Sequence, residues 1–354
     1  MDSTSPCLDF AAIGHQDSWQ NITAFVNGMR TPDHERLSSR KIKDIFSFIP
    51  PRDLFRVKVK SITGAEINGV YIETFIDPDK LEAQFARANI NKVTNAAAHA
   101  IKMNTRIATL GGFTSIVLEG NLNSFAPGKT KFTTGNTLTA AYIVKGIEGA
   151  AIQLKINLLE SDVLIIGATG DIGMACVHYL KNKVKKLLLC ARNNQQLEKL
   201  AKELAKQNKQ VEYSICLPDL ISAADVIICV ASSTGIKLAD CKKNVLICDA
   251  GYPKNMDTKI EKNVDCKIFH GGMGQVLGGF NFNPDYSNYI YHYPAPYVIH
   301  GCILEAMILA FENKIENYSV GKGNITIDKM EEIYKSGLKH GITIAPFFSA
   351  KGLW

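Results

Sequence analysis

The feature that most constrains the fold is the segment IIGATGDIG, which places Gly167, Gly170 and Gly173 between an apolar run and a helical pattern. Glycines at such a turn let backbone N–H groups approach a pyrophosphate, and the positive end of the following helix attracts the anion. The glycine spacing alone is a weak signal, but the strand before it and the helix after it supply the required context. The segment therefore predicts a dinucleotide phosphate loop. Its candidate cofactor-binding residues are Gly167, Thr169, Gly170, Asp171, Ile172 and Gly173.

Strands and helices alternate around this loop from residue 161 to residue 275. The expected strands are continuous apolar runs, which indicates a parallel sheet buried on both faces. The fold class is therefore α/β, with a doubly wound Rossmann domain at 161–275. Its expected strands cover residues 162–167, 186–191, 211–216, 225–232 and 244–250, and its helices cover 171–181 and 195–207.

Three further segments complete the predicted organisation. Residues 1–136 are expected to form a substrate-binding α/β domain, and residues 137–160 a connecting helix. Residues 276–354 are expected to hold an irregular aromatic loop and C-terminal helices. Within the first and last segments we expect a hairpin from 54–62 and 69–76, helices at 81–103, 303–316 and 324–341, and a glycine-rich turn leading into a strand within 109–119.

Composition narrows the class of protein. A chain of 354 residues with 46% hydrophobic residues favours two globular domains, and a net charge of +6 is too small to indicate nucleic-acid binding. The start lacks a signal peptide, and the uncharged stretch 286–304 contains prolines and histidines, so we expect no transmembrane segment. Nine cysteines lack zinc spacing and predict reduced thiols without a metal. We expect a soluble cytoplasmic protein, with peripheral membrane contact left open.

The end of the second expected strand, LLLCARNN, indicates which cofactor binds. A site for NAD usually offers an acidic residue there, whereas this chain offers Arg192 followed by Asn193. A guanidinium suits the 2′-phosphate of NADPH, and an exposed arginine at a helix start is the alternative. Ligands bind at the carboxyl ends of parallel strands, so two later loops complete the prediction. Their candidate cofactor-binding residues are Ala231, Ser232, Gly251 and Lys254.

Cys302 follows Gly301 at the start of an apolar helical pattern. We expect this position to lower the pKa of the thiol, because the helix dipole stabilises a thiolate. A thiolate near a nicotinamide suggests covalent catalysis on an acyl group, with simple packing as the alternative. His300 and His340 are candidate acid/base groups, with surface histidines as the alternative.

Several blocks of the sequence resemble long-chain acyl-[acyl-carrier-protein] reductases, in the same order along the chain. They are LGGFTSIVLE, KFTTGNTLTAAY, IIGATGDIG, CARNNQQLEKL, DAGYPKN, CILEAMILAFE and NITIDKMEEI…LKHG, within about Ile13 to Pro346. The TGNT element, Thr134 to Thr137, is also similar to one in shikimate dehydrogenase and glutamyl-tRNA reductase, where it marks the end of the substrate domain.

The resemblance implies NADPH-dependent reduction of fatty acyl thioesters to fatty aldehydes, with Cys302 as the nucleophile. It implies acyl-carrier protein or acyl-CoA as partner, and it leaves open whether an aldehyde-consuming enzyme is a further one. The acidic carrier gives a candidate docking role to a basic early segment, with a solvated basic face as the alternative. The cations of this basic segment are Arg36, Arg40, Lys41, Lys43, Arg52, Arg56, Lys58 and Lys60. A keto-reductase of the shikimate dehydrogenase kind and a non-catalytic NADPH sensor stay open as alternatives. The candidate substrate-binding residues are Gly111, Gly112, Phe113, Thr114 and Asn136, with Tyr286, Tyr289, Tyr291, Tyr293 and Tyr297 as further wall residues.

Overall fold

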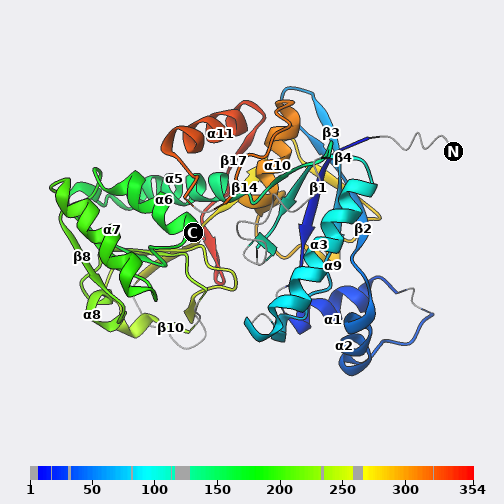
Figure 1. Ribbon diagram of the computed structural model, residues 1–354, viewed down its shortest axis with the longest axis horizontal. Helices are drawn as coiled ribbons and strands as arrows, with labels where there is room; N and C mark the ends of the chain where they lie inside the picture. Colours follow the sequence, from blue (N-terminus) through cyan, green and yellow to red (C-terminus); the bar gives the residue numbers. More distant parts are fainter. Residues whose placement is uncertain are drawn as a thin grey trace. The chain divides into compact units, whose positions relative to one another are not determined.

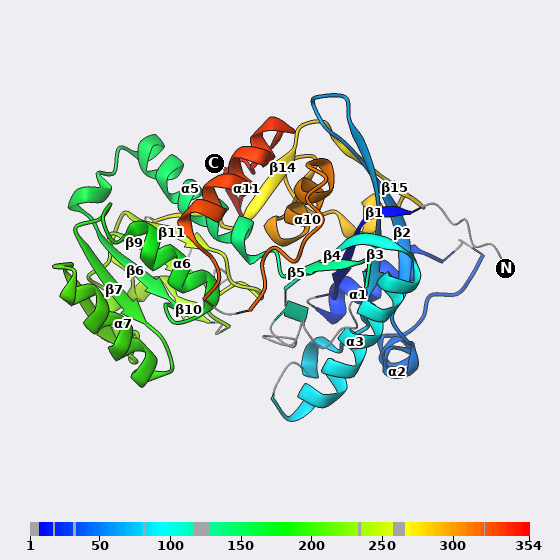
Figure 2. The same cartoon turned by 45° about the horizontal axis from the view of Figure 1, so that its top comes forward.

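The computed structural model describes residues 7–16, 18–30, 33–80, 83–112, 114–115, 128–232, 235–257, 266–321 and 323–354 (Figures 1 and 2). The chain folds into two compact units. Unit 1 comprises residues 1–135, 276–321 and 336–343, and unit 2 comprises residues 136–275, 322–335 and 344–354. The C-terminal segment from residue 276 is thus divided between both units, because the chain returns to unit 2 twice after it first leaves.

Unit 2 is built on a six-stranded parallel sheet in the order β13-β11-β9-β6-β7-β8. This is the strand order of a Rossmann domain, with β6 at the point where the order reverses. The predicted doubly wound α/β fold is therefore confirmed. The strands are β6 (Asp162–Ile166), β7 (Lys186–Cys190), β8 (Val211–Ser214), β9 (Val226–Cys229), β11 (Val245–Asp249) and β13 (Cys266–His270).

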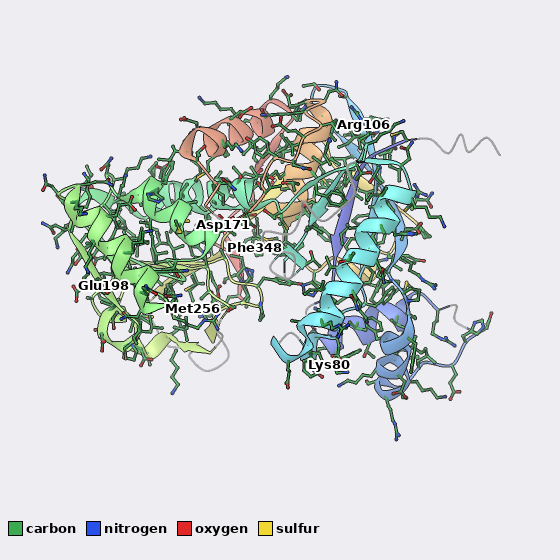
Figure 3. All side chains as sticks on the ribbon, in the orientation of Figure 1. Lys80, Arg106, Asp171, Glu198, Met256 and Phe348 are labelled. Atoms are coloured by element: carbon green, nitrogen blue, oxygen red, sulfur yellow. The ribbon has the colours of Figure 1, made fainter. Side chains whose placement is uncertain are left out.

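Helices cover both faces of this sheet, which explains why its strands are apolar throughout. In β6, Val163 and Ile165 pack with α5 (Asn136–Leu154), α6 (Asp171–Leu180) and α7 (Asn194–Lys206). Leu164 and Ile166 pack on the other face with α8 (Pro218–Ile221) and with Met256, which is labelled in Figure 3. Short strands complete the unit: β10 (Ile236–Lys237) pairs with β12 (Met256–Asp257), and β18 (Phe348–Ser349) with β19 (Gly352–Leu353).

Unit 1 has a mixed six-stranded sheet in the order β15-β2-β3-β1-β4-β5. The last four strands in this order run parallel, and β2 and β15 are antiparallel to their neighbours. The carboxyl ends of the parallel strands therefore meet at one edge of the sheet. The strands are β1 (Leu8–Gly14), β2 (Arg52–Lys60), β3 (Glu66–Glu73), β4 (Thr105–Leu110), β5 (Lys131–Thr133) and β15 (Phe280–Asn283).

Alternation along these strands assigns the two faces of the sheet. Ala108 and Leu110 of β4 face α3 (Ala86–Lys102) in one core cluster, so Thr109 between them faces the opposite side. The helix α10 (Gly301–Phe311) packs against β1, β3 and β4, and Thr109 contacts its first turn. The helices α1 (Trp19–Gly28) and α2 (Ser39–Phe48) add a smaller cluster around Phe46.

The remaining helices and strands are short, apart from α11 (Ile327–Lys339), which lies within the helix expected at 324–341. The others are α9 (Ser287–Ile290), β14 (Met273–Val276), β16 (Val298–His300) and β17 (Ile342–Ile344). Within the described ranges, the helices are too short or too polar to cross a membrane. All nine cysteines are described, and they are free thiols.

The structure corrects several predicted boundaries. The α-helix expected from residue 81 begins at Ala86, after a 3-10 turn at Ala83–Phe85, and the Asp79 carboxylate accepts hydrogen bonds from Trp19 and Lys43. The helix expected to reach residue 316 ends at Phe311, because Asn313 adopts a left-handed φ of +53°.

Two segments of unit 1 bear on the predicted types of element. The glycine-rich turn follows the strand β4, and Thr114 and Ser115 directly after it are helical. Residues 116–119 lie outside the described part. The aromatic segment expected to be irregular contributes β15, whose alternating pattern FNFN pairs with β2. In unit 2, β13 was not among the expected strands.

Candidate active site

The loop between β6 and α6 has no room for side chains at two of its glycines. Gly167 adopts a φ of +93°, and a Cβ there would lie 2.8 Å from the carbonyl oxygen of Val230. A Cβ on Gly173 would lie 2.1 Å from the carbonyl oxygen of Gly167. Gly170 is the N-cap of α6, and no described side chain caps that helix. A tight loop with an uncapped helix start is the arrangement that binds the pyrophosphate of a dinucleotide.

The carboxylate of Asp171 in this loop is held by its own unit. Its Oδ2 accepts a hydrogen bond from Asn136 Nδ2 at 3.0 Å, and its Oδ1 accepts one from the backbone N–H of Gly323 at 3.0 Å (Asp171 is labelled in Figure 3). Asn136, predicted as a substrate ligand, therefore belongs with the phosphate loop of unit 2. The residues before it, up to Gly135, belong to unit 1.

Arg192 extends from the end of β7 and is exposed. Its Nη2 lies 3.3 Å from the hydroxyl of Ser232, in the loop that follows β9. The structure thus brings together two predicted cofactor residues from different loops, and a guanidinium beside a hydroxyl suits a phosphate monoester. Asn193 instead caps α7, because its side chain accepts a hydrogen bond from the N–H of Gln196 at 3.0 Å.

The loop after β11 is organised by Asp249, which sequence reasoning did not single out. Its carboxylate is buried and accepts hydrogen bonds from the backbone N–H groups of Gly251, Asn255 and Met256. Asn255 donates from Nδ2 to the carbonyl oxygen of Ala231 at 2.9 Å and so ties this loop to the one after β9. The predicted ligand Lys254 donates back to the carbonyl of Asp249 at 3.0 Å. An Asp-x-Gly turn at a strand end was the available signal.

Cys302 lies in the first turn of α10, above the end of β4. Its carbonyl oxygen accepts a hydrogen bond from Thr109 Oγ1 at 2.6 Å, and a Cβ on Gly111 would lie 3.7 Å from its sulfur. Burial raises the pKa of the thiol to about 11. Backbone hydrogen bonds from Gly112 and Ile303 lower this pKa but do not offset the loss of water. The prediction of a lowered pKa is therefore wrong, because desolvation of the thiol outweighs the backbone hydrogen bonds that favour the thiolate.

The TGNT element packs directly on Cys302. Gly135 adopts a φ of +73°, and a Cβ there would lie 2.2 Å from the Cα and 2.5 Å from the Cβ of Cys302. Only glycine combines this backbone conformation with such a close approach. The glycine of this element therefore sets the depth at which the first turn of α10 sits.

A buried carboxylate, one turn after Cys302 in α10, stabilises the contact between the TGNT element and this helix. Glu305 is 0% exposed and accepts hydrogen bonds from Thr133 Oγ1 and from Ser319 Oγ, the latter at 2.7 Å. The hydroxyl of Thr133 in turn accepts from the N–H of Gly135 at 3.3 Å and from that of Ser319 at 3.1 Å. The negative charge of Glu305 also raises the pKa of Cys302. Glu305 is part of the CILEAM block, and no pattern in the sequence singles it out as a site residue.

The two candidate histidines have different surroundings. His300 is the N-cap residue of α10, and its Nε2 lies 2.9 Å from the hydroxyl of Tyr293. The buried His340 contacts Ser61 Oγ through Nδ1 at 3.1 Å and Glu312 through Nε2 at 2.5 Å, and it stacks on Phe311. Phe311 lies nine residues after Cys302, which is about 14 Å along the helix. The structure therefore places His340 at the far end of α10 from the thiol.

The remaining predicted substrate residues are at the glycine turn and in the aromatic segment. Gly112 has a φ of +56°, and Thr114, which is 0% exposed, donates from Oγ1 to the carbonyl of Gly111 at 2.8 Å. Phe113 lies outside the described residues. Tyr286 packs edge-on against Phe25 and Phe55 in the core of unit 1. The other tyrosines of the segment are at least partly exposed or face their own loop.

The fold of unit 2 and the relatives of the chain define the class of the protein, a Rossmann-type oxidoreductase. The model of the shikimate / quinate 5-dehydrogenase family matches residues 149–270. The chain is 36% identical over 344 residues to the long-chain acyl-[acyl-carrier-protein] reductase of Synechococcus elongatus, a match that covers 94% of this chain and 97% of that protein. The chain therefore belongs to the long-chain acyl-[acyl-carrier-protein] reductase family, as the sequence blocks predicted.

Two more distant similarities accompany this one. The aminotransferase PigE of a Serratia species is 27% identical over 305 residues, which are 82% of this chain but only 34% of that longer protein. The crystal structure of L-tryptophan dehydrogenase from Nostoc punctiforme superposes with a TM-score of 0.41 at 13% identity, covering 95% of this chain and 81% of that one.

Proposed function

We propose that this protein reduces long-chain acyl thioesters to fatty aldehydes with NADPH, through an acyl group held on Cys302. The observation that carries the proposal is the setting of the thiol, at a helix start beside two glycines and within hydrogen-bond reach of two backbone N–H groups. Membership of the acyl-[acyl-carrier-protein] reductase family supports the choice of substrate.

The residues of the Rossmann loops fit NADPH. The glycine loop would hold its pyrophosphate, and Arg192 with Ser232 would hold its 2′-phosphate. When bound, the cofactor supplies the hydride that reduces the acyl carbonyl. An exposed guanidinium in place of an acidic residue at the end of β7 is the observation that favours NADPH over NADH.

The acyl group first passes to the protein. A bond forms between the Cys302 sulfur and the acyl carbon, the thioester bond to the carrier breaks, and the thiol proton ends on the released carrier thiol. Because one thioester replaces another, this step positions the acyl group and changes little in energy. The N–H groups of Gly112 and Ile303 would stabilise negative charge as it develops there. Of the two candidate acid/base histidines, His300 is the one close to Cys302 in the sequence.

Mass spectrometry tests the covalent step. Incubation with a long-chain acyl-CoA without NADPH is expected to add one acyl group on Cys302. Cys302→Ser should lose the adduct and the activity, whereas Cys266→Ser, which removes another partly buried thiol, should lose neither. An unmodified protein with an active Cys302→Ser variant would instead support a direct keto-reductase. Tight NADPH binding without turnover on thioesters would support a sensor.

The basic segment of unit 1 is the proposed dock for the acidic carrier protein. Its cations are exposed, but Lys43 pairs with Asp79, and Lys58 and Lys60 pair with Glu66. Among the described residues, no ion pair engages the other members on or beside α2, which are Arg36, Arg40 and Lys41.

This difference in pairing supplies a matched comparison. Neutralising Arg40 and Lys41 should raise KM for acyl-carrier protein several-fold and leave KM for acyl-CoA unchanged, because only the carrier presents a large acidic surface. Neutralising Lys58 and Lys60 is the control, since both pair with Glu66, whose charge offsets one of their two charges. Equal losses on both substrates would contradict the docking role.

A further inference from the structure

A second polar cluster lies in unit 1, at the carboxyl end of β3. The Tyr71 hydroxyl donates to Glu73 Oε2 at 2.9 Å, and Gln16 Nε2 donates to the same oxygen at 3.2 Å. The other oxygen of Glu73 accepts from the backbone N–H of Phe75 at 3.0 Å. Glu73 is 1% exposed, while Tyr71 is half-buried. The cluster is thus a buried carboxylate whose hydrogen-bonded tyrosine reaches toward the surface.

Strand register places this cluster on the same face of the sheet as Cys302. Ala12 of β1 is level with Tyr71 on one side and with Thr109 on the other. Residues that are level in neighbouring strands point to the same face, and Thr109 Oγ1 binds the carbonyl of Cys302. Tyr71 and Thr109 are therefore separated by two strand spacings, about 10 Å between backbones. β1, β3, β4 and α10 can be followed in Figure 2.

Two glycines on neighbouring strands lie between the tyrosine and the thiol. Gly14 ends β1 and Gly111 follows β4, and the N–H of Gly111 donates to the carbonyl of Ile13, so the two glycines occupy neighbouring strand ends. A Cβ on Gly14 would lie 3.0 Å from the Tyr71 hydroxyl, and one on Gly111 would lie 3.7 Å from the Cys302 sulfur. The Tyr71 hydroxyl therefore lies over Gly14, and the Cys302 sulfur lies over Gly111.

From this juxtaposition we infer that Tyr71, backed by Glu73, carries the proton between the Cys302 thiol and the thiol that leaves the substrate. The inference rests on the proposed function. As the bond between sulfur and acyl carbon forms, the thiol proton passes to the Tyr71 oxygen while the Tyr71 proton passes to Glu73. As the bond to the carrier thiol breaks, Glu73 returns its proton to Tyr71, and Tyr71 protonates the leaving sulfur. Each group ends in its starting state.

The ionisation of Glu73 suits this task. Burial raises the pKa of this carboxyl to about 7, so it can hold and release a proton at neutral pH. Two charged groups face Glu73. Lys92 of α3 donates to the carbonyl of Phe75, and Arg52 of β2 is the residue paired with Glu73 in the strand register. A thiol with a pKa of about 11 needs such a proton acceptor to react at neutral pH.

The test measures how fast Cys302 is acylated without NADPH, with two thioesters that differ in their leaving thiol. Tyr71→Phe removes the hydroxyl and keeps the ring stacked on Phe55. We expect it to slow acylation by acyl-CoA about 100-fold. The loss should be much smaller with an acyl thiophenol ester, because its thiolate leaves without a proton. Tyr318→Phe, which removes a buried hydroxyl elsewhere in unit 1, is the control and should retain its rate.

The pH dependence of the same rate examines Glu73. Acylation of the unmodified protein should rise with pH through about 7 as Glu73 ionises, and Glu73→Gln should lose this step. Equal slowing of Tyr71→Phe with both thioesters, or no slowing, would overturn the inference and leave the acyl-enzyme intact. Absence of acylation in the unmodified protein would instead overturn the proposed function itself.

Discussion

The contact between Gly135 and Cys302 gives the sharpest prediction about stability. In Gly135→Ala, the new methyl group would lie 2.2 Å from the Cα of Cys302, where carbon atoms normally approach to about 3.5 Å. The backbone at Gly135 or the first turn of α10 must therefore move by about 1 Å. Because Cys302 is in that turn, the substitution should disturb the thiol as well as the fold.

Two costs contribute to the loss of stability. A residue with a Cβ at a φ of +73° loses about 1–2 kcal/mol relative to glycine, and overpacking in a tight contact costs about 1–3 kcal/mol. We expect Gly135→Ala to lower the free energy of unfolding by about 2–5 kcal/mol. Gly64→Ala is the matched control, since Gly64 has a φ of +87° and nothing within 4 Å of its added Cβ. It should lose only the first cost.

Urea unfolding can be followed in unit 1 alone. The chain has two tryptophans, Trp19 in unit 1 and Trp354 in unit 2, so a Trp354→Phe background leaves Trp19 fluorescence as a probe of unit 1. Any change in the entropy of the unfolded chain is common to both alanine variants and cancels in their difference. If Gly135→Ala were no less stable than Gly64→Ala, the packing of this element on α10 would be refuted.

Three further predictions concern charged groups. Arg192→Ala should raise KM for NADPH about 10-fold or more, because a charge-assisted contact is lost, and should leave KM for NADH unchanged. Lys199→Ala on α7 is the control. Equal effects on KM for both cofactors would contradict the 2′-phosphate contact. Glu305→Gln should move the alkylation of Cys302 by iodoacetamide to lower pH, because a negative charge that raises the pKa of Cys302 is removed; an unchanged profile would contradict it. Glu73 has a folded pKa of about 7 against 4.5 in its ordinary state, so its contribution to stability is complete below pH 4.5 and lost as pH rises to about 7. The free energy of unfolding should therefore fall across this range by about 3 kcal/mol relative to Glu73→Gln, and parallel curves would contradict the raised pKa.

The doubly wound domain could be predicted because its signals are local. A strand buried on both faces must be apolar throughout, and a loop that contacts a pyrophosphate must have glycines at fixed spacing. The segment around Gly167 satisfies both conditions within a few residues, and the structure has the expected strand, loop and helix there. Arg192 could be nominated for the same reason, since its place at the end of the second strand follows from counting along the chain.

Boundaries and partners that depend on distant residues could not be predicted in this way. Asp79, which the sequence placed at a helix start, binds Trp19, sixty residues away, and β15 joined a sheet whose other strands lie more than 140 residues earlier. The contact of the Asn136 amide with Asp171, 35 residues away, is another such relation, and the role of Asn136 as a substrate ligand stays a prediction.

By itself, the sequence determined the Rossmann domain and the candidate cofactor residues, because each depends on residue types at short spacing, and the family resemblance nominated Cys302 as the candidate thiol. Only the tertiary structure decided how that thiol ionises, since its pKa depends on burial and on Glu305, Gly112 and Ile303 together. It also decided that Gly135 supports Cys302, and that Tyr71 lies across β1 from Thr109. Such relations arise when parallel strands bring distant segments to a common edge, and no spacing in the chain records them.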